Sequence, residues 1–186
     1  LKKNSIIGTS SFRREYQIKK IRSDLECKLI RGNVDTRIKK LKDGTYDAII
    51  LSYAGIKFLN FDSEISEIFS PEKIIPSAGQ GIIALQCRED DEEIISVLKK
   101  INHNETFMRA YVERNILKVL EGDCETAVGA HSIIKDDKVI VEAELFSLDG
   151  SKRYYEKKTG KLVEFSQNRR NVSQNLKKKY NNTYII

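Results

Sequence analysis

Arginines placed beside small hydroxyl residues are the feature of this sequence best suited to chemistry. Arg13 and Arg14 follow Thr9-Ser10-Ser11, and a second polar turn lies between Arg31 and Arg37. Guanidinium groups bind carboxylates and phosphates through paired hydrogen bonds. Hydroxyl residues at a helix start also leave backbone N–H groups that attract anions. The pattern predicts a polyanion site, and solvated surface arginines are the alternative.

The arginines stand where apolar runs give way to helical patterns, and this order occurs three times in residues 1–60. Such an alternation is typical of a parallel or mixed sheet covered by helices. The arginine turns should then meet at the carboxyl ends of the strands. The expected elements are a strand at Ile6-Ile7 that turns at Gly8, a helix over Arg14–Arg22, a strand over Leu25–Ile30, a helix over Val34–Lys42 capped by Asn33, a strand over Tyr46–Leu51 and a short helix over Ser52–Leu59.

A polar linking region follows the third helix. Residues 61–75 predict a connection with one or two helical turns, and Ile82–Cys87 predicts a further strand. The acidic turn Arg88–Glu93 then begins a helix that continues to Ile101. Just before the predicted strand, Gly79-Gln80-Gly81 indicates a strained turn, with a phosphate-binding loop as the less favoured alternative.

The second half of the chain predicts a small α+β domain. Its long amphipathic helix should begin at Asn104 as N-cap and end at Gly122, just before the loop Asp123-Cys124-Glu125. Short turns separate the strands that follow, so we expect an antiparallel meander. The expected elements are strands over Thr126–Ile134, Val139–Phe146 and Arg153–Lys158, followed by a polar helix over Asn168–Tyr180 anchored by Val172 and Leu176.

Positive charge is concentrated in the first third of the chain. Residues 1–60 contain 14 Lys or Arg and 6 Asp or Glu residues, whereas residues 61–100 contain 4 and 9. A basic region can bind nucleic acid, but no zinc-finger, RRM or homeodomain pattern is present, and aromatic residues do not alternate with the basic ones. A small polycarboxylate or phosphate explains the same charge. We expect no nucleic-acid partner.

The three cysteines, Cys27, Cys87 and Cys124, are widely spaced. They predict reduced thiols in an intracellular protein, with Cys27 and Cys87 in strand cores. The sequence offers only His103 and His131 as imidazole ligands, at no metal-binding spacing, so no metal is expected. No apolar run reaches the ~20 residues of a membrane span. The start at Leu1 leads us to expect a fragment or a processed chain.

Taken together, these residues resemble the porphobilinogen deaminase (hydroxymethylbilane synthase) family, and the match extends along almost the whole chain. The residues that carry it are Gly8-Thr-Ser-Ser-Phe-Arg-Arg14, Ile30-Arg-Gly-Asn-Val-Asp-Thr-Arg37, Tyr46-Asp-Ala-Ile-Ile-Leu51, Ala54-Gly55, Gly79-Gln-Gly81, Cys87-Arg88, Glu113-Arg114 and Leu120-Glu-Gly-Asp-Cys124. Together they are very specific, although each is weak alone.

The resemblance implies a transferase of tetrapyrrole biosynthesis. Such an enzyme joins four porphobilinogen molecules head to tail and releases ammonia at each addition. The chain would grow on a dipyrromethane cofactor attached to Cys124. The carboxylates of cofactor and growing chain would be bound by Thr9, Ser10, Ser11, Arg13, Arg14, Arg31 and Arg37, with backbone contacts at Ser52, Ala54, Gly55 and Gln80.

Considered without the resemblance, Cys124 is better explained as a buried structural thiol. The helix end before it and the acidic neighbours Asp123 and Glu125 should raise its pKa, so it does not resemble an activated nucleophile. An anchor that is alkylated once fits those surroundings. Two positions depart from the family pattern: Asp123 replaces a Gly, and Ala127 replaces a Pro.

The implied fold has three parts. Residues 1–76 would form most of a periplasmic-binding-protein-like α/β domain, residues 77–98 a crossing that belongs with an absent first domain, and residues 99–186 the cysteine-bearing domain, with helices on one face of its sheet. The catalytic aspartate would lie in the absent domain, so we expect this chain alone to be inactive. The parent is expected to be a monomer in the cytoplasm, or in a plastid if a targeting segment preceded it. A non-catalytic anion-binding module and a nucleic-acid-binding protein remain as alternatives.

Overall fold

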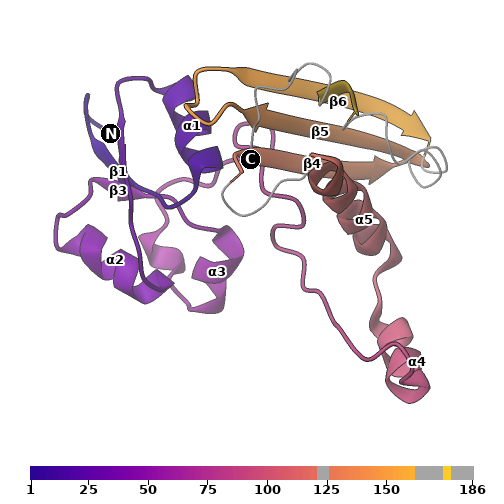
Figure 1. Cartoon of the computed structure of the whole chain (residues 1–186). Helices are drawn as coiled ribbons and strands as arrows, with labels where there is room; N and C mark the ends of the chain where they lie inside the picture. Colours follow the sequence, from indigo (N-terminus) through magenta and orange to yellow (C-terminus); the bar gives the residue numbers. More distant parts are fainter. Residues whose placement is uncertain (121–125, 162–173, 177–186) are drawn as a thin grey trace.

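The computed structural model describes residues 1–120, 126–161 and 174–176. These residues form two three-stranded sheets, one in each half of the chain (Figure 1). The first sheet is parallel and the second is antiparallel. The predicted order of an α/β region followed by an α+β region is confirmed.

The first sheet has β1 (Ile6–Gly8) at its centre, between β2 (Glu26–Lys28) and β3 (Ala48–Ile49). Each strand is followed by a helix: α1 (Phe12–Ile21), α2 (Val34–Lys42) and α3 (Tyr53–Phe58). Ile7, Ile18 and Leu25 form the core between the sheet and α1. A short 3₁₀ turn, η1 (Asp62–Glu64), follows in the connection.

Helix α1 begins two residues earlier than predicted, at Phe12. Ser11 is its N-cap, and the Ser11 hydroxyl accepts a hydrogen bond from the backbone N of Arg14 at 3.4 Å. Both Arg13 and Arg14 therefore lie in the first turn of the helix. Asn33 precedes α2 as predicted, but its side chain makes no capping hydrogen bond.

The second sheet has the order β4 (Val128–Lys135), β5 (Lys138–Phe146), β6 (Arg153–Lys161). Helix α5 (Asn104–Val119) packs against β4, and Figure 1 shows it on one face of the sheet. The core between them contains Val112, Ile116 and Leu176. The predicted N-cap is wrong by one residue: His103 caps α5, because its Nδ1 accepts a hydrogen bond from Thr106 N at 3.3 Å. The predicted end at Gly122 lies outside the described residues, as does most of the last predicted helix.

The predicted strand over Ile82–Cys87 is wrong for this chain. Residues 82–88 have no ladder partner among the described residues, and the side chains of Ile83 and Leu85 are 87% and 58% exposed. A strand needs a neighbouring edge to pair with its backbone groups. Cys87 is half-buried and belongs to no core cluster.

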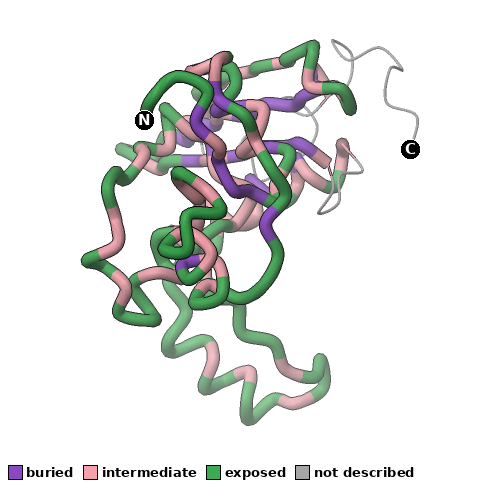
Figure 2. Tube along the Cα trace, turned by 90° about the vertical axis from the view of Figure 1, so that its left-hand side faces the viewer, coloured by how far each residue is buried: buried purple, intermediate pink, exposed green. Residues whose placement is uncertain are grey.

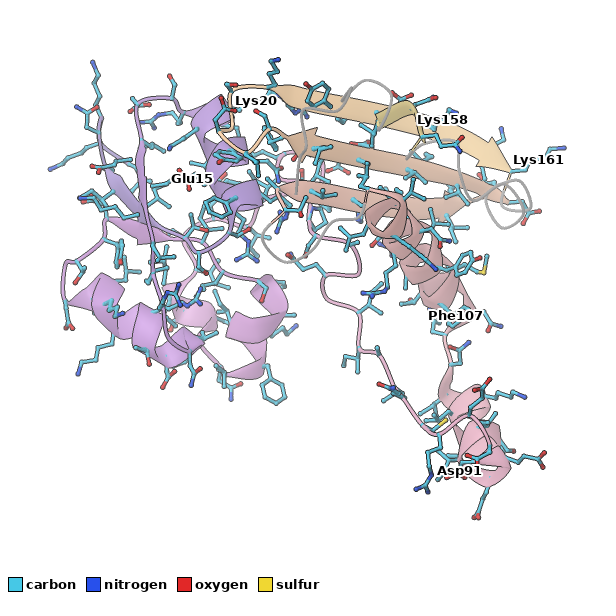
Figure 3. All side chains as sticks on the ribbon, viewed as in Figure 1. Glu15, Lys20, Asp91, Phe107, Lys158 and Lys161 are labelled. Carbon is cyan, nitrogen blue, oxygen red and sulfur yellow. The ribbon has the colours of Figure 1, made fainter. Side chains whose placement is uncertain are left out.

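We call residues 82–103 the arm. It contains α4 (Glu92–Ile101), which confirms the predicted helix, and none of its residues is buried (Figures 1 and 2). Asp91 caps α4 by accepting from Ile94 N at 3.1 Å, and lies at the far end of the arm (Figure 3). The exposed side chains of Ile94, Val97 and Ile101 leave α4 with an uncovered apolar face.

Helix α1 and the segment before the arm connect the two sheets. The ring of Tyr16 lies 5.6 Å from that of Phe146 at the end of β5, and the Tyr16 hydroxyl donates to the carbonyl of Leu148 at 2.6 Å. The backbone N of Ala130 in β4 donates to the carbonyl of Pro76 at 2.8 Å. These contacts place the segment after Ile75 between α1 and the second sheet.

Candidate functional site

A pocket of about 760 Å³ opens where the loops after β1, β2 and β3 meet. Parallel strands direct their carboxyl ends to one edge of the sheet, which is the usual ligand site of open α/β folds. The pocket is lined by Arg14, Gly32, Asn33, Val34, Asp35, Arg37, Leu51, Ser52, Leu59 and Phe61.

Two of the predicted arginines, Arg14 and Arg37, line this pocket. Arg14 Nη1 donates to the carbonyl of Ile50 at 3.1 Å. Arg37 Nε donates to the carbonyl of Gly32 at 2.7 Å, and its Nη1 donates to Ser10 Oγ at 3.2 Å. Backbone carbonyls therefore orient both guanidinium groups, and their positive charges remain available to a ligand.

Burial and the charge of Arg37 lower the pKa of Arg14. Two cations that repel each other at one pocket wall favour a bound anion, because the anion removes the repulsion and supplies hydrogen-bond acceptors. One carboxylate, that of Asp35 in the first turn of α2, also lines the pocket, but its residue is exposed. The pocket wall as a whole is suited to a ligand that carries carboxylates.

Arg13 has a different position from Arg14. It is 4% exposed and does not line the pocket. Its Nη1 donates to the carbonyl of Ile75 at 2.6 Å, and its Nη2 to Gln80 Oε1 at 3.3 Å. Burial, together with the charge of Arg14, lowers the pKa of Arg13 to about 10, so it stays charged at neutral pH. Arg13 holds the segment between the two sheets.

The hydroxyl residues divide between structure and pocket. Thr9 is buried, and its Oγ1 accepts from the backbone N of Ser11 at 3.2 Å, which shapes the turn before α1. Ser10 is exposed and holds Arg37, whereas Ser52 lines the pocket. Gly55 lies in the first turn of α3, beside the Ser52 hydroxyl.

The remaining predicted residues lie around this site or outside the described part. Arg31 is exposed, lies outside the pocket lining, and its carbonyl accepts from Lys40 Nζ at 3.0 Å. Ala54 is exposed at the start of α3. Gln80 contacts both Arg13 and Arg14 through its side-chain oxygen. Cys124 is outside the described residues.

Sequence reasoning missed the apolar wall of the pocket. Leu51, Leu59 and Phe61 line the pocket beside the arginines and give it apolar surface. An available signal was that Leu59 and Phe61 follow a helix too short to bury them. A pocket with an apolar wall and two arginines is suited to a flat apolar ring that carries carboxylate groups.

Other classes of site find no support in the described part of the chain. Across residues 1–120, 126–161 and 174–176, no group of three or more His, Cys, Asp or Glu side chains is arranged to hold a metal ion. Among the helices of these same residues, none has the length and apolar character needed to cross a membrane.

The fold is an α/β region with a pocket lined by Arg14 and Arg37, joined to an α+β domain with an antiparallel sheet. The chain belongs to the porphobilinogen deaminase family. Residues 1–96 match the family description "Porphobilinogen deaminase, dipyromethane cofactor binding domain", and residues 107–179 match "Porphobilinogen deaminase, C-terminal domain".

Individual relatives agree with the family match. The porphobilinogen deaminase of Coxiella burnetii (strain RSA 493 / Nine Mile phase I) is 44% identical over 147 residues, which cover 79% of this chain and 48% of the relative. That of Desulforamulus reducens is 43% identical over 152 residues, covering 82% of this chain and 49% of the relative. The chain thus spans about half the length of the curated relatives it matches.

Proposed function

We propose that this chain is the arginine-bearing and cysteine-bearing part of a porphobilinogen deaminase, which joins four porphobilinogen molecules into hydroxymethylbilane with release of ammonia. The observation that carries the proposal is the pocket in which Arg14 and Arg37 stand beside Leu51, Leu59 and Phe61. A pyrrole with acetate and propionate side chains has the matching chemistry, since its ring is apolar and its substituents are anionic.

The pocket residues fit a dipyrromethane cofactor. Arg14, Arg37 and Ser52 would bind its carboxylates, and the apolar wall would lie against its rings. When bound, the cofactor supplies the pyrrole position to which the first substrate unit is joined. We assign its attachment to Cys124, on the family resemblance.

The residues of this chain act by neutralising and orienting charge. Each pyrrole unit adds two carboxylates, so a growing chain needs several cationic groups that do not move. The carbonyls of Ile50 and Gly32 fix the guanidinium groups of Arg14 and Arg37 before a ligand arrives. Preorganised donors of this kind bind anions without a reorganisation cost at the moment of binding.

We assign no proton-transfer group at the pyrrole nitrogens to the described residues. A deaminase needs such a group, and we expect it in the part of the relatives that this chain does not match. The 186-residue chain should therefore show no multiple turnover by itself. Supplying the unmatched part as a second polypeptide should restore some activity.

We also propose that the protein works in the cytoplasm as a monomer, with porphobilinogen and its linear products as its partners. The described cysteines Cys27 and Cys87 are free thiols, which is consistent with a reducing compartment.

Titration calorimetry tests the pocket on the 186-residue chain. Porphobilinogen should bind, and unsubstituted pyrrole, which has no carboxylates, should not. Arg14→Gln should weaken binding of porphobilinogen. Arg22→Gln is the matched control, because Arg22 pairs with Asp24 away from the pocket. Equal affinity of the two ligands, or equal effects of the two substitutions, would contradict the pocket assignment.

Intact-mass measurement tests the deaminase itself, on the protein purified from its natural source. We expect a two-pyrrole adduct and release of ammonia from porphobilinogen. An adduct-free protein that binds porphobilinogen without releasing ammonia would instead favour the non-catalytic binding module.

A further inference from the structure

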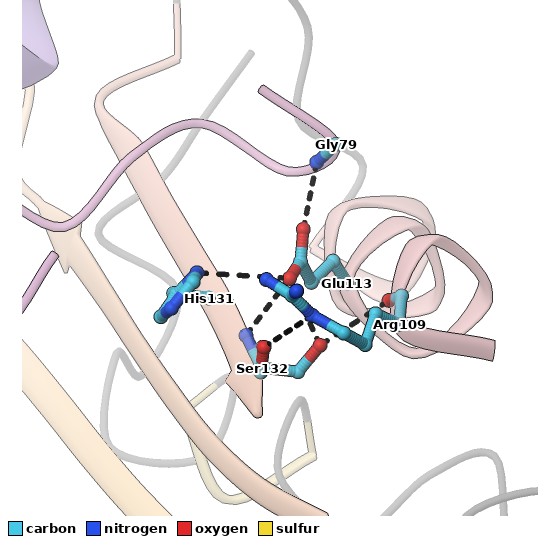
Figure 4. A network of polar contacts seen from close by, with 5 residues as sticks. All are labelled: Gly79, Arg109, Glu113, His131 and Ser132. Atoms are coloured by element: carbon cyan, nitrogen blue, oxygen red, sulfur yellow. Dashed lines mark hydrogen bonds and ion pairs between the residues drawn. The ribbon is translucent and has the colours of Figure 1, made fainter. Parts of the chain in front are cut away.

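The turn at residues 79–81 is held from two sides. Toward α1, Gln80 Oε1 lies 3.3 Å from Nη2 of Arg13 and 3.3 Å from Nη2 of Arg14, and accepts from both. Toward the second sheet, the backbone N of Gly79 donates to Oε2 of Glu113 at 2.8 Å (Figure 4). Adjacent residues of one turn thus connect the arginines to a carboxylate on α5.

Glu113 is itself fixed in place. It is 3% exposed, and its Oε1 accepts from both the backbone N and the hydroxyl of Ser132 in β4, at 2.8 and 2.9 Å. With one oxygen bound to β4 and the other to the turn, the carboxylate cannot shift without breaking a hydrogen bond. The bonds from Ser132 are the costly ones to break, because Ser132 is fully buried and its orphaned N–H group would have no water to replace the carboxylate.

Hydrogen bonds, more than a full ion pair, hold this carboxylate. His131 Nδ1 lies 3.9 Å from Glu113 Oε1, but burial lowers the pKa of His131, so the ring is neutral at neutral pH. Arg109 lies beside the carboxylate in Figure 4 and donates from its Nε to the carbonyl of Ser132 at 2.7 Å. Arg109 therefore fixes β4 against α5.

The turn depends on this support because its own conformation is unusual. Gly79 and Gly81 have φ values of 73° and 82°, in the left-handed region that glycine adopts most easily. Because glycine also has the greatest backbone freedom, such a turn needs contacts from outside to stay in one conformation. Gln80 is exposed, and its side-chain hydrogen bonds to described residues go to Ser77 and to the two arginines of α1. The Pro76 carbonyl and the Ala78 side chain also contact the second half of the chain, through Ala130 N and through the core under α5. Among the described hydrogen bonds of residues 79–81, the Gly79–Glu113 bond is the one that reaches α5.

We propose that Glu113 is a positioning residue for the carboxylate site. By holding Gly79, it places the Gln80 oxygen between the guanidinium groups of Arg13 and Arg14, which would otherwise repel each other and separate. Arg14 is then kept at the pocket wall with its remaining N–H groups directed at a ligand. The proposal rests on the proposed function only for the identity of that ligand.

The first experiment tests, without a ligand, whether Glu113 controls the position of Gly79 and of the two arginines. In the 186-residue chain, NMR follows hydrogen exchange at the Gly79 amide and the side-chain N–H signals of Arg13 and Arg14. Glu113→Gln keeps the size of the side chain but leaves one acceptor oxygen, which should stay with the two donors of Ser132 and release Gly79. We expect at least tenfold faster Gly79 exchange and shifted signals of both arginines.

Two further variants complete this experiment. Glu113→Leu removes both acceptor oxygens and so covers the case in which the Gln side chain keeps Gly79 instead of Ser132. Glu105→Gln is the matched control, because Glu105 is an exposed carboxylate in the first turn of the same helix, and it should leave Gly79 and both arginines unchanged. Unchanged Gly79 exchange in both Glu113 variants, or faster exchange with unmoved arginine signals, would overturn the proposal.

The second experiment reads the consequence for binding, with porphobilinogen as the probe. Glu113→Gln and Gln80→Leu should each weaken binding about tenfold, and the double variant should bind no more weakly than Gln80→Leu alone. That non-additivity is expected because Glu113 acts through Gln80. Additive losses would contradict the proposal, because they would show that Glu113 affects binding by a route that does not pass through Gln80. If the wild-type chain binds no porphobilinogen, the proposed function fails, and the NMR arm still decides the positioning role.

Discussion

Gln17 and Ile75 form a reciprocal pair of hydrogen bonds. Gln17 Nε2 donates to the Ile75 carbonyl at 2.9 Å, and Ile75 N donates to Gln17 Oε1 at 2.6 Å. Both residues are buried, and the same carbonyl also accepts from Arg13 Nη1. Ile75 is thus bound to two side chains of α1, Gln17 and Arg13, and the same helix contributes Arg14 to the pocket.

Gln17→Leu should destabilise the chain by about 1–3 kcal/mol, because it leaves the buried N–H of Ile75 without an acceptor. The Ile75 carbonyl keeps Arg13 and adds little to the loss. Urea unfolding measures the change. Lys19→Gln on the exposed side of α1 is the control: it breaks only a surface pair with Glu15 and should cost no more than about 1 kcal/mol. Equal effects of the two substitutions would contradict a structural role for Gln17.

Arg37→Met should weaken porphobilinogen binding by about 1.5–3 kcal/mol, the typical value of a hydrogen bond to a charged group. Arg31→Met should have a smaller effect on the same titration, because Arg31 lies outside the pocket lining. The sequence alone predicts losses of activity for both. A larger loss for Arg31 than for Arg37 would show that the ligand binds elsewhere on this edge.

Cys124→Ser in the natural protein should abolish the two-pyrrole adduct, whereas Cys27→Ala and Cys87→Ala should act mainly through stability. Burial raises the pKa of the Cys27 thiol, which reduces its thiolate fraction and its reactivity. Peptide mapping of the intact protein checks the attachment site. An adduct on Cys27 or Cys87 would refute the assignment.

Glu144 should make stability fall as pH rises above about 4.5. It is 1% exposed, and Arg153 Nε donates to its Oε2 at 2.8 Å, while Oε1 has no partner among the described residues. Burial raises the pKa of Glu144 despite Arg153. The folded state thus binds the proton more tightly than the unfolded state, so stability is greatest below the ordinary pKa and declines through the raised one.

Glu144→Gln should remove that decline, so its free energy of unfolding should improve relative to wild type as pH rises from about 4.5. Urea unfolding at several pH values between 4 and 8 measures the difference. Glu142→Gln is the control on the same strand, since Glu142 pairs with Lys157 at the surface. A pH-independent difference between wild type and Glu144→Gln would contradict the prediction.

Ile83→Ser should change the free energy of unfolding by less than about 0.5 kcal/mol, because Ile83 is 87% exposed in the arm. It should also reduce self-association in light scattering, since the arm presents unpaired backbone and apolar side chains to water. Ile116→Ala, on the buried face of α5, should lower the free energy of unfolding by about 2–5 kcal/mol. A large loss of stability for Ile83→Ser would show that the arm is packed in solution.

The sequence by itself determined the elements that depend on local pattern. Apolar spacing and cap residues predicted α2 to its observed bounds, and the repeated strand–helix order predicted the parallel sheet. The edge at which the arginine turns meet follows from the same order, because parallel strands end on one side. The antiparallel meander followed from short turns between alternating strands.

Only the tertiary structure decided which arginine faces the pocket. Arg13 and Arg14 are neighbours on a helix of 3.6 residues per turn, so their side chains leave the helix about 100° apart and enter different surroundings, although both guanidinium groups reach Gln80 Oε1. Packing against Ile75 took Arg13 into the interior and left Arg14 at the pocket. Residues 82–87 have the apolar pattern of a strand, but a strand forms only beside the edge of a sheet, and local sequence does not show whether such an edge is present. The Gly79–Glu113 bond joins residues 34 positions apart, a distance at which only the fold decides contact.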